Sequence, residues 1–138
     1  MKKIILFAII SLMSCSSDSE NDIKEESSYY IKYVVKGGAW YRSPFGHTSR
    51  PEHTDIYFMD KNNTIDKTSY YGDVSFSKVV GPVDKSFKPS LSAKGQNGGT
   101  YSASYEGTIE VLKDGIKLVG SNSAKGYGSI SLTCDIND

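Results

Sequence analysis

Apolar and polar residues alternate along most of the chain after residue 28. In residues 29–36, Ile31, Tyr33 and Val35 fall on one face of an extended chain, and the lysines fall on the other. A period of two is typical of a strand that buries one face. The same alternation predicts further strands at residues 54–60, 74–80, 86–93, 101–105, 108–113, 116–120 and 127–136.

Turn residues separate these expected strands. Asp114–Gly115 stands between two strand-like runs, and this pair favours a two-residue type I′ hairpin because both positions need positive φ. Gly81–Pro82 is expected to end one strand. Pro89 predicts an edge position for its own strand, since proline donates no ladder hydrogen bond.

These patterns predict the fold class. Seven or eight short strands, with a turn about every 8 to 12 residues, indicate an all-β fold, a single antiparallel immunoglobulin-like β-sandwich over residues 29–138. The Cys–Trp–Cys signature of antibody domains is missing, so the patterns indicate the architecture alone.

The amino terminus follows a different pattern. Lys2 and Lys3 precede residues 4–13, nine of which are apolar, and this order is typical of a secretory signal. The apolar run is shorter than the roughly 20 residues that a membrane-spanning helix needs.

A cysteine motif closes this leader. Leu12-Met13-Ser14-Cys15 resembles the lipobox of bacterial lipoproteins. The resemblance implies that residues 1–14 are a signal peptide and that Cys15 becomes the lipidated first residue of the mature chain, which anchors it to a membrane. A plain secretory signal that contains a cysteine is the alternative.

Residues 15–28 are acidic and rich in serine. Such a composition buries too little apolar surface to order itself, so we expect a flexible tether after the lipidated cysteine. The stretch also resembles the surface-export signal of lipoproteins in some Gram-negative anaerobes. This resemblance implies an outer-membrane protein that faces the cell surface, and a simple spacer on a periplasm-facing lipoprotein is the alternative.

The charges and chemical motifs of the chain mainly exclude classes of function. The 16 basic and 16 acidic residues cancel, and no basic stripe indicates a nucleic-acid partner. His47 and His53 share one loop with Glu52 nearby, but their spacing is not a known zinc pattern, so we expect no metal. The chain has no Gly-x-Ser-x-Gly motif and no Gly-rich phosphate loop, and we expect no enzyme activity and no cofactor. We also expect a monomer.

The second cysteine of the chain has a structural interpretation. Cys134 alternates with Ile130, Leu132 and Ile136 on the last expected strand. We expect it to be a small buried side chain, with an intermolecular disulfide or a reactive thiol as the alternative.

One loop is unusually rich in aromatic and basic residues. Tryptophan, tyrosine and arginine are enriched at binding hot spots, and loops on a rigid sandwich often carry recognition. The loop therefore predicts a binding site for a partner protein or a glycan, unless its aromatic residues fold back to cap the core. The candidate residues are Trp40, Tyr41, Arg42, Phe45, His47 and Arg50.

Several strand-like runs resemble the small MmpS-like domains of bacterial lipoproteins. That resemblance implies a single β-sandwich, in some bacteria accessory to lipid-exporting transporters. The chain departs from it in its long connections at residues 37–53 and 94–107, and in Phe76, where tryptophan is commoner. The runs are Tyr30-Ile-Lys-Tyr-Val-Val, Asp55-Ile-Tyr-Phe, Ser75-Phe-Ser-Lys-Val-Val-Gly-Pro-Val, Ser90-Leu-Ser-Ala, Ile109-Glu-Val-Leu-Lys-Asp-Gly and Gly128-Ser-Ile-Ser-Leu.

The expectation for function combines these features. We expect a non-catalytic, surface-exposed lipoprotein that presents a β-sandwich to a partner protein or glycan. A periplasmic accessory lipoprotein of a transporter, or an inhibitor or immunity-type lipoprotein, is the alternative.

Overall fold

The computed structural model describes residues 27–38, 41–42, 48–49, 53–96 and 103–137. All regular structure in these residues is β. The strands are β1 Tyr29–Gly37, β2 Tyr41–Arg42, β3 Thr48–Ser49, β4 His53–Met59, β5 Ile65–Tyr70, β6 Val74–Val83, β7 Ser90–Gln96, β8 Ser104–Lys113, β9 Lys117–Tyr127 and β10 Ser129–Thr133.

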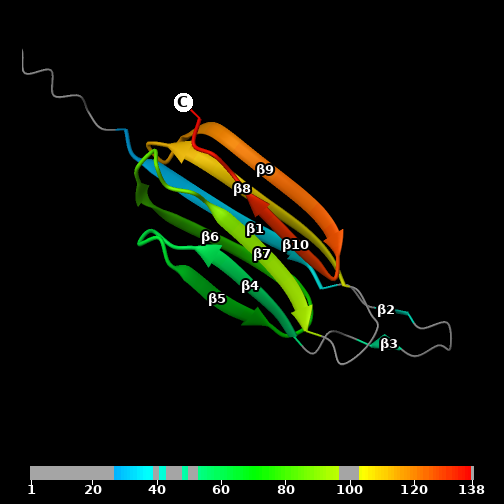
Figure 1. Ribbon diagram of the computed structural model, residues 1–138. Helices are drawn as coiled ribbons and strands as arrows, with labels where there is room; N and C mark the ends of the chain where they lie inside the picture. Colours follow the sequence, from blue (N-terminus) through cyan, green and yellow to red (C-terminus); the bar gives the residue numbers. More distant parts are fainter. Residues whose placement is uncertain (1–26, 39–40, 43–47, 50–52, 97–102, 138) are drawn as a thin grey trace, which may run out of the picture.

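In the described ranges, eight of these strands form two antiparallel sheets that pack as layers (Figure 1). The first sheet has the order β6-β1-β8-β9, the second has the order β10-β7-β4-β5, and β2 pairs with β3 alone. The expected antiparallel β-sandwich of seven or eight strands is therefore confirmed. The first strand pairs with β6 and β8, unlike the first strand of an immunoglobulin constant domain, so the likeness to that fold is one of architecture.

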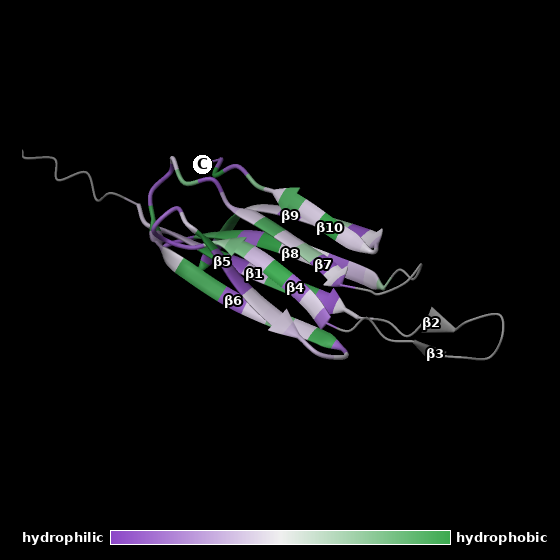
Figure 2. Cartoon of the chain, turned by 60° about the horizontal axis from the view of Figure 1, so that its bottom comes forward, coloured by the Kyte–Doolittle hydropathy of each residue, from purple (hydrophilic) through white to green (hydrophobic). Residues whose placement is uncertain are grey.

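The core lies between the sheets and consists of the apolar faces that the alternation predicts. Ile31, Tyr33 and Val35 of β1 have no exposed surface. Ile109 and Val111 of β8, which lie beside Tyr33 and Ile31 in the same sheet, have none either. Figure 2 shows hydrophobic and hydrophilic bands alternating along the strands. Because burying one such side chain contributes about 1.5 to 3 kcal/mol, this alternation decides which face of each strand turns inward.

The expected hairpin at Asp114–Gly115 is confirmed. Both residues have positive φ, 52° and 73°, and the Ile116 N–H donates to the Lys113 carbonyl at 3.1 Å. The ladder resumes with Lys113 opposite Lys117. The connection therefore has three residues instead of the expected two.

The expected edge position for the strand around Pro89 is wrong. β7 begins at Ser90 and lies between β10 and β4. Pro89 is buried just before the strand, where its carbonyl accepts a hydrogen bond from the Cys134 N–H at 3.2 Å. Because the proline precedes the ladder, its missing N–H costs no strand pairing.

Other strand boundaries also differ from the expectation. β6 continues through Gly81–Pro82 instead of ending there, and its pairing with β1 shifts at this point, as a β-bulge does. β8 joins two expected strands into one. β5 was not expected, because its residues are all exposed or half-buried and so show no apolar stripe.

Cys134 is less buried than the sequence predicts. β10 ends at Thr133, and Cys134 follows it as a free, partly buried cysteine that packs against the core. Ile136 is buried at 5% exposure, as the pattern predicts.

The strand directions make the two ends of the sandwich different. The chain enters β1 at one end, and the connections β4–β5, β6–β7 and β8–β9 lie there too. We call this the tether end. The connections β1–β4, β5–β6, β7–β8 and β9–β10 lie at the opposite end, which we call the loop end (Figure 1). The two long connections, β1–β4 and β7–β8, join strand ends at the loop end, and most of their residues lie outside the described ranges.

Candidate functional site

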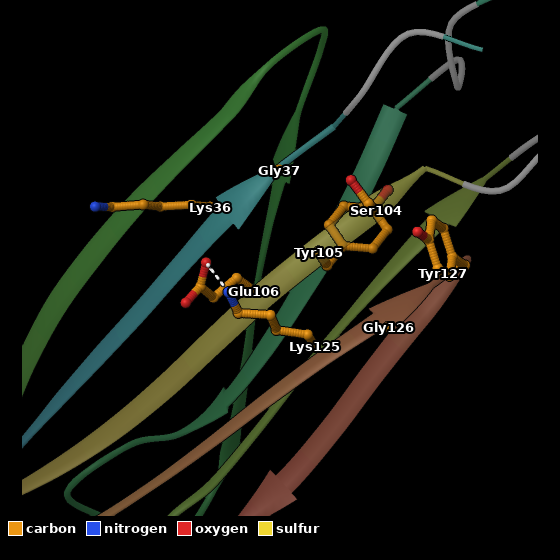
Figure 3. Close-up of a pocket in the computed structure, with 8 residues that line it drawn as sticks. All are labelled: Lys36, Gly37, Ser104, Tyr105, Glu106, Lys125, Gly126 and Tyr127. Atoms are coloured by element: carbon orange, nitrogen blue, oxygen red, sulfur yellow. Dashed lines mark ion pairs between the residues drawn. The ribbon is translucent and has the colours of Figure 1, made fainter.

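A hollow of about 390 Å³ opens at the loop end of the first sheet. Strands β1, β8 and β9 all contribute to it (Figure 3). The lining residues are Lys36, Gly37, Ser104, Tyr105, Glu106, Lys125, Gly126 and Tyr127.

The sheet brings these residues together from three distant parts of the chain. Lys36 pairs with Glu106, and Glu106 pairs with Lys125, so the three charged residues form one row across the strands. Side chains directly opposite each other in such a row lie about 4.5 to 5.5 Å apart at Cβ. The sheet therefore fixes the positions from which these three side chains leave the backbone.

The charges of this row do not cancel. The Lys125 ammonium lies 3.3 Å from the Glu106 carboxylate, and both side chains are more than half exposed, so the pair adds little stability. Lys36 is exposed and has no ion pair in the described part of the chain. An unpaired positive charge therefore lies beside the hollow, on a side chain that extends away from Tyr127 in Figure 3.

An aromatic ring stands at the edge of the hollow. Tyr127, the last residue of β9, is 80% exposed. In Figure 3 its ring lies near Ser104, the residue opposite it in the ladder. Exposed tyrosine offers a flat apolar face and a hydroxyl together, which suits it to recognition.

Tyr105 forms the rigid base of the hollow. It is 2% exposed, and its hydroxyl and the Thr54 hydroxyl share a hydrogen bond of 2.8 Å that joins the two sheets. Burial raises the pKa of the Tyr105 phenol, and the hydrogen bond with Thr54 opposes that shift. The phenol therefore stays neutral and serves as a structural support.

The backbone is closely packed at the same place. Gly37 has φ of 145°, and a Cβ atom there would collide with the Ser104 carbonyl oxygen. Nearby, the Gly128 N–H donates to the Ala103 carbonyl at 2.7 Å, and the Gly128 carbonyl accepts from the Gly95 N–H at 3.0 Å. These contacts tie both sheets together, so the hollow is held by rigid elements.

A buried carboxylate lies on the second sheet at the same end. Asp55 is 3% exposed although it points away from the core. Its oxygens accept hydrogen bonds from the Ser69 hydroxyl at 2.6 Å and from the Gln96 amide at 3.3 Å, and Lys67 lies 3.0 Å away. The Ser69 hydrogen bond, with help from Lys67, lowers the pKa of Asp55 against the opposing effect of burial.

The Asp55 cluster orients one of the two histidines. His53 lies with Nε2 3.5 Å from the Asp55 carboxylate. On its other side the imidazole contacts the ring of Tyr71, with centroids 5.8 Å apart. Tyr71 is 79% exposed, so it adds a second exposed tyrosine to the loop end.

The residues predicted from the aromatic and basic loop are only partly within the described ranges. Tyr41 and Arg42 form β2 and pair with Ser49 and Thr48 of β3. The other predicted loop residues and the lipidation site lie outside the described residues. These are Trp40, Phe45, His47, Arg50 and Cys15.

Two further observations concern the chemistry of the described part of the chain. In it, no group of three or more His, Cys, Asp and Glu side chains is arranged to hold a metal ion. No helix among the described residues is long and apolar enough to cross a bilayer.

Comparison of the chain with protein-family models, with curated proteins and with solved structures finds no match in any of the three. The interpretation of the site therefore depends on its geometry.

The main residues of the hollow were not found from the sequence. Tyr127 and Lys36 are 91 positions apart (127 minus 36), and each looks like an ordinary surface residue of a strand. Only the pairing of β1 and β9 with β8 brings them to one place. From the sequence, the alternation predicts only that both side chains point away from the core.

Proposed function

We propose that this protein is a non-catalytic, lipid-anchored surface lipoprotein whose β-sandwich presents its loop end to a partner protein or glycan. The observation that carries the proposal is the opposite placement of the two ends. The amino-terminal segment joins the fold at the tether end, whereas the long connections and the hollow lie at the loop end. An anchor at Cys15 would therefore direct the loop end away from the membrane.

The chemistry of the hollow suggests what the partner offers. An exposed ring at Tyr127 suits the flat face of a sugar or an apolar side chain. The unpaired ammonium of Lys36 suits an acidic group, and the Glu106–Lys125 pair offers hydrogen-bonding groups to hydroxyls. We propose a partner that carries an acidic group beside such a surface.

Metabolic labelling tests the anchor. With a fatty-acid analogue supplied to producing cells, the parent chain takes up label and the Cys15→Ser variant takes up none, because a thioether to lipid needs the thiol. Persistent labelling of the variant would contradict lipidation at Cys15.

Protease treatment of intact cells tests the orientation. A surface-exposed domain is cleaved without permeabilisation. Protection until the outer membrane is opened would instead support a periplasm-facing protein, either an accessory lipoprotein of a transporter, as the MmpS-like resemblance implies, or an inhibitor or immunity-type lipoprotein.

Affinity capture with the mature full-length chain tests recognition by the loop end. Binding of the captured partner should weaken by about 2 kcal/mol in a Lys36→Ala/Tyr127→Ala variant, the usual magnitude for a hot spot. Lys88→Ala is the matched control, because Lys88 is equally a surface lysine but lies at the tether end, 2.8 Å from Asp135. Equal losses in both variants would contradict the assignment of the site.

A further inference from the structure

The hairpin between β8 and β9 exposes apolar side chains at the tether end. Ile116 is 88% exposed and Leu118 is 56% exposed, and only one residue separates them. Leu118 lies opposite Leu112, which lies opposite Tyr30, so the apolar surface continues across three strands. Single exposed apolar residues are ordinary, but contiguous ones mark a surface that contacts something.

This hairpin is the part of the fold that is joined to the amino-terminal segment. The Asp114 N–H donates to the Ser28 carbonyl at 2.7 Å, and the Ser28 N–H donates back to the Asp114 carboxylate at 3.3 Å. The amino-terminal segment therefore joins the fold beside the turn that carries Ile116.

The charges around the hairpin are mixed. Lys113 and Lys117 lie opposite each other at its base, whereas Glu25 and Glu26 stand shortly before Ser28 in the sequence, so charge by itself does not identify what the tip contacts. The acidic group at the tip, Asp114, is engaged by the Ser28 N–H.

We propose that residues 113–118, which we call the hairpin tip, dock on the same bilayer that holds the acyl chains of Cys15, with Ile116 and Leu118 at the headgroup boundary. The inference rests on the lipid anchor of the proposed function. The thirteen residues 15–27 span at most about 45 Å when fully extended, so the tether keeps the hairpin tip close to the membrane. A weak contact then becomes effective, because tethering makes it intramolecular.

Lipid-quenching fluorescence on the acylated, mature full-length chain tests the inference. The chain is reconstituted in phosphatidylethanolamine–phosphatidylglycerol vesicles after an environment-sensitive fluorophore is attached at Lys117→Cys, in a Cys134→Ser background so that one thiol reacts. We expect its emission to shift to shorter wavelength and to be quenched by lipids that carry a nitroxide near the headgroup. Adding Ile116→Ser and Leu118→Ser should remove both effects while the chain stays on the vesicles.

The matched control places the fluorophore at Asn62→Cys. Asn62 is an exposed turn residue between β4 and β5 at the same end of the sandwich, in a turn whose residues 60–64 are all polar, although Ile65 follows it in β5 with 54% exposure. We expect quenching there to be several times weaker than at position 117. Melting curves of each variant establish that the fold is retained, which we expect because Ile116 and Leu118 are largely exposed.

The possible outcomes separate the inference from the anchor on which it rests. A chain that does not float with the vesicles overturns the anchor and the inference together. A chain that floats but shows equal quenching at both positions, or quenching that survives the serine substitutions, overturns the inference alone. A shift to shorter wavelength without quenching would show that the fluorophore contacts protein and not lipid, and it would also overturn the inference.

Discussion

Asp55 shows how a single polar residue stabilises the sandwich. Its carboxylate is nearly inaccessible to water, yet Ser69 and Lys67 of β5 and Gln96 of β7 all provide donors to it. A buried charge is tolerated only when it is paired in this way. The side chain therefore acts as a cross-link on the outer face of the second sheet.

The predicted effect of Asp55→Asn is a loss of about 2 kcal/mol in the free energy of unfolding at neutral pH, since a hydrogen bond to a charged group is replaced by one to a neutral amide. Because the folded pKa of Asp55 lies below its usual value of 3.8, its stabilisation is present above that value and is lost as pH falls through the folded pKa. Urea denaturation of parent and variant at neutral and acidic pH measures this. An equal difference at both pH values would contradict the role of the charge.

Cys134 leads to a prediction about reactivity. Burial raises the pKa of its thiol, and the negative charge of Asp135 raises it further, so little of the reactive thiolate forms at neutral pH. We expect slow alkylation of the native chain by iodoacetamide, a rate that climbs with pH, and fast alkylation in urea. Native labelling as fast as in urea would show that the thiol is freely accessible.

At the scale of the elements, the hairpin of β8 and β9 depends on backbone conformation more than on side-chain contacts. Gly115 has φ of 73°, and a Cβ atom there would meet only the Tyr30 ring at an ordinary 3.6 Å. Steric crowding is therefore not the reason that this position needs glycine. The requirement is the left-handed backbone conformation, which disfavours residues with a Cβ.

Gly115→Ala should consequently lower the free energy of unfolding by about 1 to 2 kcal/mol. Gly120→Ala is the control, because Gly120 lies in β9 without positive φ and a Cβ there would make only ordinary contacts, the nearest at 3.5 Å. Thermal or urea denaturation compares the two variants. A loss at Gly120 as large as that at Gly115 would mean that strain in the turn is not the cause.

The elements also show how far a local pattern predicts strands. It predicts β1 closely, because Ile31, Tyr33 and Val35 have to face one way for burial. It misses β5, which is held by pairing with β4 and leaves Ile65 54% exposed. A strand without a buried face has no apolar period to detect.

At the scale of the whole molecule, the separation of the tether end from the loop end organises the proposed function. The hairpin tip would face the membrane while the hollow beside Tyr127 faces outward. Both proposals use the same axis of the sandwich, so an experiment on one end should leave the other unchanged.

The aromatic loop gives a prediction at this scale. If Trp40 and Tyr41 form a recognition surface at the loop end, truncating both to alanine should leave the melting temperature within a few degrees of the parent and weaken binding of the captured partner by about 2 kcal/mol or more. Thermal melting and titration with that partner measure the two effects. A large fall in melting temperature would instead show that the aromatic residues cap the core, because truncating buried aromatic side chains costs about 3 to 5 kcal/mol.

The sequence by itself determined the class of the fold, the inward face of most strands and the Asp114–Gly115 turn. These features depend on neighbouring residues, since side-chain period and backbone preference are local properties. The tertiary structure alone decided that Pro89 precedes a central strand, that Lys36, Glu106 and Tyr127 meet at one hollow, and that the amino-terminal segment and the long connections lie at opposite ends. Strand order depends on the packing of residues far apart in the chain, and no local period carries that information.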